Sequence, residues 1–379
     1  MHPRKIASLL PTLIAIATLL AVTSAAYGQH PTNRHSGNIT VVASTVPANG
    51  DVNPYGIVRV PRSVGKLVRG SILISNFNNS ANLQGTGTTI VQISPTGSFS
   101  QFAQIDAGAL PGPCPGGVGL TTALVVLRSG WVIVGSLPTS DGSAATAQAG
   151  CLIVLDSSGN VAETITDAQI NGPWDMTAFD ETGDEGHASR ASLFVANVLN
   201  GTAAAGGSVV NEGTVVRVDL DVSSSANPSV ESITVIGSGF SERTDPAALV
   251  IGPTGVALGK NHKTLYVADS LNNRIAAISD PLHRSSSANT GTTVSSGGSL
   301  NDPLGMTLSI DGNILTANGN DGNLVETTPM GKQIATTQLD GTGNPPGAGT
   351  LFGLVDVPGH GLFFVDDGSN TLNLESGKR

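Results

Sequence analysis

One motif returns along this chain and limits what it can fold into. Its clearest copy is GPTGVALGKNHKTLYVADSLNNRI at residues 252–275. A turn containing Pro and Gly leads into a short apolar run, a polar hairpin follows, and a second apolar run ends in Asp or Asn. Six such units, of about 56 residues each, fit between residues 39 and 376. One unit of this length cannot bury both of its faces, so the units are expected to pack against each other around a ring.

The predicted fold is therefore an all-β, six-bladed β-propeller with four-stranded antiparallel blades. The sixth unit lacks an outermost strand, while ITVVAST at residues 39–45 precedes the first unit as a spare strand. We expect this N-terminal strand to close the ring beside residues 371–376 of the last blade. A two-sheet sandwich and a pair of small β domains are the alternatives, but neither explains a recurring Pro-x-Gly turn.

The composition agrees with short strands and tight turns. The chain has 379 residues, of which 48 are glycine, with 12% charged and 4% aromatic residues. Gly and Asn tolerate turn geometry, and β-branched residues suit a pleated surface. The acidic balance and the lack of a basic cluster argue against nucleic acid as a partner.

The first 28 residues have the order of a secretory signal. Arg4 and Lys5 precede an apolar stretch over residues 6–22, and small residues follow. A membrane anchor is the competing interpretation, although the run is short for a spanning helix. We expect a signal peptide at 1–28, a flexible segment at 29–38, the propeller at 39–376 and a tail at 377–379. The mature protein would be secreted or periplasmic, with no membrane insertion after the signal is removed.

The motif resembles the NHL repeat, whose pattern is a Pro-x-Gly turn, a strand, a turn, a strand ending in Val-Ala-Asp, and an Asn-Arg-Ile group. The matching residues are Pro253, Gly255, Val267, Ala268, Asp269, Asn273, Arg274 and Ile275. The other units match in part, as in NPYG, GPWD and DPLG. The chain is more distantly similar to the gluconolactonase and strictosidine-synthase-like propellers. This resemblance implies a propeller whose relatives include binding scaffolds, lyases and lactone hydrolases.

The recurring residues have a structural role first. Pro fixes φ at the turn, and Gly permits close approach near the ring axis. An Asp or Asn after the second strand can bond the backbone two residues on. Arg274 is expected to pair with Asp269 of its own blade or with a carboxylate of the next.

The leading turns and the ends of the second strands meet at one face of such a ring. Their polar and aromatic side chains are the candidate ligand-binding residues: Asn53, Tyr55, Asn76, Trp174, Asp175, Asn197, Asp269, Asp302, Asn318 and Asp366. Oxygen donors of this kind suit Ca²⁺ or another divalent cation, or a sugar. The metal-ligand candidates are Asp175, Asp269, Asp302 and Asp366. Tyr55 and Trp174 either stack a ligand there or pack the fold.

An enzyme is the weaker expectation. The chain has no G-x-S-x-G elbow and no phosphate loop. His187, His262 and His360 fall in hairpins of the opposite face, which argues against a zinc lyase or a His-dependent lactonase. A gluconolactonase-like hydrolase implies a divalent cation held by Glu, Asn and Asp, and no Glu facing the channel is evident.

Two cysteines are present, Cys114 in a leading turn and Cys151 at the start of a third strand of the same unit. In an exported protein such a pair is more often bridged than free, so we predict a disulfide that clamps residues 137–150.

The sequence thus favours a non-catalytic module that binds an extracellular or periplasmic protein or a carbohydrate. The alternative is a divalent-metal-dependent lactone or ester hydrolase at the same face. A purely structural module that uses the blade edges is a third reading.

Overall fold

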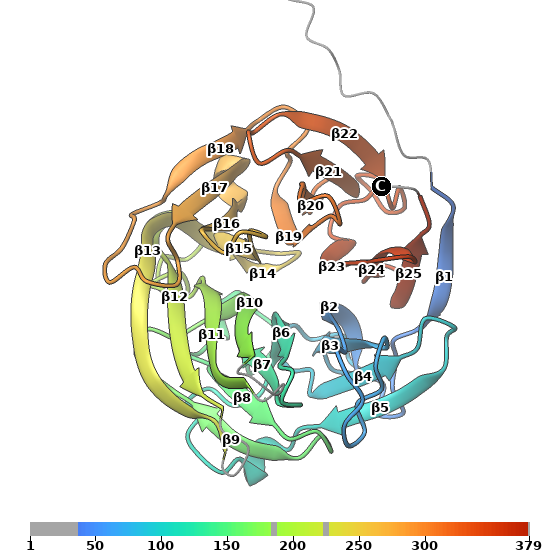
Figure 1. Cartoon of the computed structure of the whole chain (residues 1–379), viewed down its shortest axis with the longest axis vertical. Helices are drawn as coiled ribbons and strands as arrows, with labels where there is room; N and C mark the ends of the chain where they lie inside the picture. The colour runs from blue at the N-terminus through green and yellow to red at the C-terminus, as the bar shows by residue number, and fades with distance from the viewer. Residues whose placement is uncertain (1–36, 183–187, 223–226, 378–379) are drawn as a thin grey trace, which may run out of the picture. The chain divides into compact units, whose positions relative to one another are not determined.

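Six antiparallel sheets surround a common axis (Figure 1). The computed structural model describes residues 37–182, 188–222 and 227–377, so the expected signal peptide, His187 and most of segment 29–38 lie outside the described residues. In the described part, helix is limited to three 3₁₀ turns, η1 (Ala107–Ala109), η2 (Ala144–Thr146) and η3 (Ser270–Asn272). No helix in these residues is long and apolar enough to cross a membrane. The prediction of an all-β, six-bladed propeller is confirmed.

Each blade runs outward from an inner strand beside the axis. Blade 1 contains β2 (Val52–Arg59), β3 (Ile72–Asn78), β4 (Thr89–Ile93) and β5 (Phe99–Gln104). Blade 2 contains β6 (Leu120–Val126), β7 (Val132–Ser136), β8 (Cys151–Leu155) and β9 (Val161–Ile165). Blade 3 contains β10 (Pro173–Thr182), β11 (Ala188–Asn197), β12 (Val210–Asp221), β13 (Ser229–Asp245) and β14 (Leu249–Ile251).

The remaining blades follow the same pattern. Blade 4 contains β15 (Pro253–Leu258), β16 (Thr264–Asp269), β17 (Arg274–Ser279) and β18 (Thr292–Ser296). Blade 5 contains β19 (Pro303–Leu308), β20 (Ile314–Asn318), β21 (Asn323–Thr327) and β22 (Gln333–Gln338). Blade 6 contains β23 (Leu351–Val357), β24 (Gly361–Asp366), β25 (Thr371–Glu375) and β1 (Ile39–Ser44).

The ring closes as the sequence predicts. β1 pairs antiparallel with β25, from Ile39 opposite Glu375 to Ser44 opposite Thr371. The two ends of the described chain therefore complete one sheet, and no blade is left with three strands.

The inner strands approach each other closely at the glycines of the leading turns. A Cβ at Gly305 would lie 1.7 Å from the carbonyl oxygen of Phe352, and one at Gly353 would lie 2.4 Å from the carbonyl oxygen of Tyr55. Any side chain would therefore push neighbouring blades apart. We call the end of the ring that carries these turns the turn face, and the opposite end, where each inner strand connects to the second strand, the hairpin face.

Apolar residues fill the spaces between neighbouring blades. Ile133 and Val154 of blade 2 pack with Leu193 and Val216 of blade 3, and the other interfaces repeat this arrangement. Because successive side chains of a strand point to opposite sides, each blade supplies both of its interfaces. The cluster between blades 6 and 1 is larger, because it continues across the turn-face end of the axis.

The predicted disulfide is present. Cys114 and Cys151 are bonded, with their Cα atoms 5.2 Å apart. Cys114 precedes β6 and Cys151 begins β8, so the bond ties the leading turn of blade 2 to its third strand and spans the loop at residues 137–150.

Candidate functional site

Aromatic side chains fill the turn-face end of the central channel. Tyr55 stacks on Phe352 with ring centroids 3.8 Å apart and on Phe77 with centroids 4.5 Å apart. Trp174 is tilted against the same group, 6.5 Å from Tyr55 and 6.4 Å from Phe352. Tyr55 and Trp174 are each 2% exposed. In this structure both side chains pack the fold and leave no free ring face for a ligand.

A hairpin that the sequence pattern does not show covers these rings. β13 continues past blade 3 and turns back as β14, pairing Arg243 with Ile251. We call residues 243–251 the cap hairpin. Trp174 Nε1 donates to the carbonyl oxygen of Val250 at 3.0 Å, and the Tyr55 hydroxyl donates to that of Ala247 at 3.2 Å. We call Tyr55, Phe77, Trp174 and Phe352 the aromatic plug. The plug and the cap hairpin together close the channel at the turn face.

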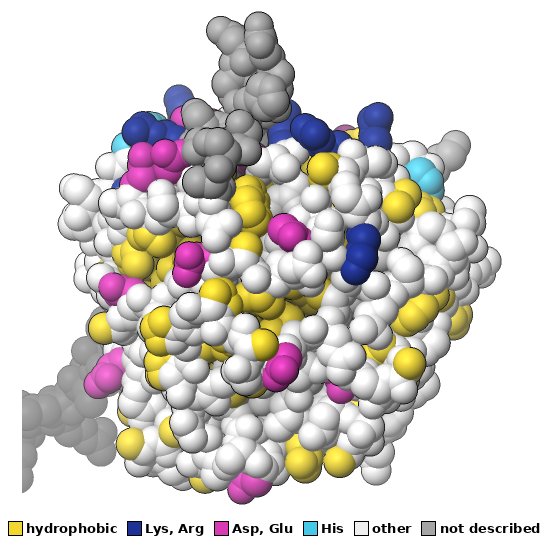
Figure 2. Space-filling view, turned by 90° about the horizontal axis from the view of Figure 1, so that it is seen from below, with side chains coloured by type: hydrophobic (Ala, Val, Ile, Leu, Met, Phe, Trp, Pro, Cys, Tyr) yellow, Lys and Arg dark blue, Asp and Glu magenta, His cyan; other side chains and the backbone are white. Residues whose placement is uncertain are grey.

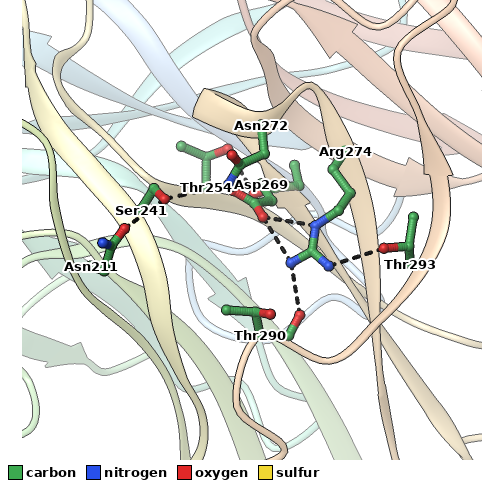
Figure 3. A network of polar contacts seen from close by, with 9 residues as sticks. Asn211, Ser241, Thr254, Asp269, Asn272, Arg274, Thr290 and Thr293 are labelled. Atoms are coloured by element: carbon green, nitrogen blue, oxygen red, sulfur yellow. Dashed lines mark hydrogen bonds and ion pairs between the residues drawn. The ribbon is translucent and has the colours of Figure 1, made fainter.

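Asp269 belongs to a network of hydrogen bonds, in which its partners lie in its own blade (Figure 3). Its Oδ2 accepts from Arg274 Nη2 at 2.8 Å and Nε at 2.9 Å, and its Oδ1 accepts from Asn272 at 2.9 Å. Arg274 also donates to Thr293 Oγ1 and to the carbonyl oxygen of Thr290. Burial raises the pKa of Asp269, and Asn272 and Arg274 oppose that shift. Arg274 therefore pairs within its own blade, the first of the two partners that the sequence suggested.

The predicted asparagines are buried at strand ends. Asn76 Nδ2 donates to the carbonyl oxygen of Thr45 at 3.1 Å, and Asn318 Nδ2 donates to that of Ser299 at 2.7 Å. Asn197 is also fully buried, and its amide reaches the carbonyl oxygen of Val195 at 3.5 Å. Asn53 precedes the plug, with φ at 64° and its backbone N–H donated to Asn370 Oδ1. These side chains hold the corners of the blades.

Asp302 and Asp366 lie at the turn face among other carboxylates. Burial and then the charge of Asp245 raise the pKa of Asp302 to about 6. Burial raises the pKa of Asp366, and it raises that of Asp367 to about 7 with further contributions from Asp366 and Asp340. The turn face is therefore acidic around the closed end of the channel.

The four metal-ligand candidates do not form one ligand set. Asp269 is bound to Arg274, Asp175 lies inside the channel below the plug, and Asp302 and Asp366 belong to separate blades. Across residues 37–182, 188–222 and 227–377, no three His, Cys, Asp or Glu side chains gather to hold a metal ion. The described donors at the turn face do not fit the divalent cation that the resemblance implies.

Below the plug the channel contains a cavity of about 260 Å³. Its walls are the inner strands, and Asp175 is the one ionisable side chain among the described residues that line it. The lining runs from Asp175 towards the hairpin ends of the strands, at Val58, Leu258 and Val355. Since the plug closes the other end, this cavity is reached from the hairpin face.

Asp175 follows Trp174 in the leading turn of blade 3 and is 8% exposed. Its Oδ2 accepts from the backbone N–H of Val256, in the neighbouring inner strand, at 3.0 Å. Burial raises the pKa of the Asp175 carboxyl to about 7, and the backbone N–H groups of Val256 and Met176 oppose the shift. A carboxyl that titrates near neutral pH within a cavity is typical of a general acid or base.

Thr122 lines the same cavity from the inner strand of blade 2. Its hydroxyl is buried and has no hydrogen-bond partner among the described residues. The sequence analysis did not single out Thr122, because GLTT lacks the Pro that marks the leading turns of blades 1, 3, 4 and 5. Asp175 was selected because its leading turn was recognised. Its position below the plug depends on packing between blades, which the sequence pattern does not show.

Comparison with known proteins supports the fold and shows the family. The family model described as SMP-30/Gluconolactonase/LRE-like region matches residues 134–346, more than half of the chain. No curated protein matches the chain.

Solved structures with the same fold cover most of it. A gluconolactonase from Xanthomonas campestris is 11% identical, with 90% of each chain covered and a TM-score of 0.55. A luciferin-regenerating enzyme is 10% identical, with 89% of this chain and 94% of that chain covered and a TM-score of 0.52. Regucalcin, a calcium-binding protein from Agrobacterium tumefaciens, is 12% identical, with 89% and 96% covered and a TM-score of 0.51. At these identities the likeness establishes the propeller fold alone. The match of the family model decides the assignment: the chain belongs to the SMP-30/gluconolactonase/LRE-like family.

Proposed function

We propose that this chain hydrolyses a small cyclic ester, a lactone, in the channel below the aromatic plug. Membership of a family that includes gluconolactonases supports a hydrolase over a non-catalytic module. The observation that carries the proposal is the Asp175 carboxyl, buried at the closed end of a cavity with its pKa raised to about 7. Such a carboxyl can take a proton from water and return it near neutral pH.

In the proposed reaction, ionised Asp175 accepts a proton from a water molecule as the water oxygen bonds to the lactone carbonyl carbon. The hydroxyl of Thr122 donates a hydrogen bond to the carbonyl oxygen as negative charge develops there. The ring C–O bond then breaks, and the leaving oxygen takes the proton back from Asp175. One water is consumed, and the product is a hydroxy acid.

The size of the cavity limits the substrate. Ligand pockets for drug-sized molecules span about 300–1,000 Å³. A cavity of about 260 Å³ suits a single sugar-sized ring rather than an oligomer. The proposed steps use Asp175 and Thr122 only, because the four candidate aspartates do not converge on a metal position.

Substitution of Asp175 tests the proposal. Asp175→Asn keeps the shape and removes the base, so we expect kcat/KM for D-glucono-1,4-lactone to fall about 100-fold or more. Asp302→Asn is the matched control, since it removes another buried carboxyl with a raised pKa outside the channel. The wild-type rate should rise with pH through about 7, as Asp175 ionises, and should survive EDTA.

Equal hydrolysis by the wild type and Asp175→Asn would overturn the proposal. Loss of activity in Asp302→Asn to the same extent would show that the effect belongs to the fold and not to the channel.

A second candidate is non-catalytic binding in the same channel. The part of the cavity nearest the hairpin face is apolar, with Val58, Leu258, Leu308 and Val355 in its wall. These side chains bring no group that could take part in a reaction, which suits a ligand that is bound without being converted, such as a carbohydrate or an extracellular or periplasmic protein segment. Binding without turnover, retained in Asp175→Asn, would support this alternative.

The disulfide supports a location outside the reducing cytoplasm. We therefore propose that the reaction takes place in the periplasm or outside the cell.

A further inference from the structure

The two faces of the ring differ in charge. Among the described residues, only Arg243 and Arg274 place a positive charge at the turn face. Arg217 is buried within β12, and the other Lys and Arg lie in or beside the hairpins of the opposite face. Figure 2 shows Lys and Arg side chains gathered along one edge of the ring, whereas Asp and Glu are spread over the surface. The turn face therefore repels an approaching anion more strongly than the hairpin face does.

A groove on the hairpin face adjoins the channel. Its volume is about 660 Å³, and it shares Thr177 and Leu258 with the channel lining. The groove is lined by Arg128 of blade 2, by Asp180 of blade 3, and by Lys260 and His262 of blade 4. A molecule that enters the channel from this face passes these polar side chains.

Two side chains in the groove are available to donate hydrogen bonds to a ligand, Arg128 and His262. The guanidinium of Arg128 is exposed and makes no hydrogen bond or ion pair with the described residues. The ring of His262 lies against Phe179 with centroids 4.6 Å apart, which fixes it at the groove wall. Lys260 Nζ donates to the carbonyl oxygen of Ile310, so it adds charge but has a partner.

Asp180 offsets part of this charge. Its Oδ2 accepts from the backbone N–H of Arg128, and its Oδ1 is buried with no hydrogen-bond partner among the described residues. Burial raises the pKa of Asp180, and the charge of Arg128 opposes that shift, so the two side chains attract each other. The guanidinium of Arg128 is still exposed, and Lys260 adds a second positive charge to the groove.

We propose that the channel ligand is an organic anion whose carboxylate binds Arg128 and His262 in this groove, while its uncharged end occupies the channel. Arg recognises carboxylates with two parallel hydrogen bonds. The groove begins at Thr177, about 7 Å along β10 from Asp175 at the rise of a β-strand. A chain of about six carbons spans that distance. The inference rests on the proposed site in the channel and names its ligand class, but it does not depend on hydrolysis.

Equilibrium binding of two matched, unreactive compounds tests this inference. D-gluconate and D-glucitol share one six-carbon polyol chain, and only D-gluconate carries a carboxylate, at one end. By calorimetry we expect the wild type to bind D-gluconate more tightly, and Arg128→Gln to weaken that binding about 10-fold or more. Arg62→Gln is the control, because it removes the same charge from the same face without lining the groove. It should change the affinity less than about two-fold, by loss of long-range attraction alone.

Equal affinity for the two compounds, no binding of either at millimolar concentration, or equal effects of the Arg128 and Arg62 substitutions would each overturn the inference. Because neither compound can be hydrolysed, the result is separate from the lactonase test. No hydrolysis by the wild type in the first test, together with selective D-gluconate binding here, would leave an anion-binding protein.

Discussion

At the scale of single residues, Glu242 is the side chain that the sequence analysis missed most completely. It lies near the end of β13 and is fully buried. Its Oε1 accepts from the backbone N–H of Asn200 at 3.0 Å and from Thr202 Oγ1 at 3.3 Å, while Oε2 has no partner among the described residues. Burial raises the pKa of Glu242 from 4.5 to about 8, and the charge of Glu212 adds to the shift.

This shift gives a pH dependence with a definite sign. The folded protein holds the Glu242 proton more tightly than the unfolded chain, so the stabilisation is complete below about pH 4.5 and is lost as pH rises through about 8. Glu242→Gln should therefore flatten the decline of the free energy of unfolding over this range. Urea denaturation at several pH values measures it, with the exposed Glu181→Gln as control. A decline as steep in Glu242→Gln as in the wild type would contradict the assignment.

Residue roles were only partly readable from the sequence. Tyr55, Trp174 and Asp175 stand in equivalent turns, and each was selected because a leading turn lies near the axis. Whether such a side chain packs into a plug or faces a cavity depends on the five other turns that meet it. That information lies in contacts between blades, which the local pattern does not contain.

At the scale of elements, the cap hairpin is the feature that departs from the repeat. Residues 229–251 form one long strand and a short return strand, where every other blade ends with a single outer strand. The repeat pattern predicts an outer strand here but not the return strand β14. The reason is that β14 pairs only with the end of β13, which extends beyond the length of a normal outer strand.

The hydrogen bond between Trp174 and the cap hairpin can be tested by one substitution. Trp174→Phe keeps a large ring in the plug but loses the donor to the carbonyl oxygen of Val250, so we expect a loss of about 1 kcal/mol in the free energy of unfolding. The control is Trp131→Phe, at a half-buried position outside the plug. Chemical denaturation compares the two, and an equal or greater loss in the control would argue against a specific tie.

At the scale of the whole molecule, ring closure was predictable because it follows from counting strands. The sixth unit lacks one strand and one spare strand precedes the first unit, so the simplest arrangement pairs the spare strand with the last blade. The channel was less predictable, since the same ring could be open at either face. Its closure at the turn face depends on Tyr55, Trp174 and Phe352 occurring together.

Adjacent positions in β1 test the closure. Val42 packs against the apolar cluster between blades 6 and 1, whereas Val41 is 66% exposed. Val42→Asp should lower the free energy of unfolding by about 2–4 kcal/mol, because a charge then replaces an apolar contact at the closing sheet. Val41→Asp should change it by less than about 0.5 kcal/mol. Similar unfolding curves for the two variants would show that β1 does not carry the closure.

The plug also decides how molecules move through the ring. A channel that is closed at one end has one opening, so a molecule that enters must leave through the same opening. An occupant that lingers blocks the next arrival, and a long polymer cannot thread through from face to face. Only a free small molecule or the free end of a polymer chain can reach the closed end of this channel.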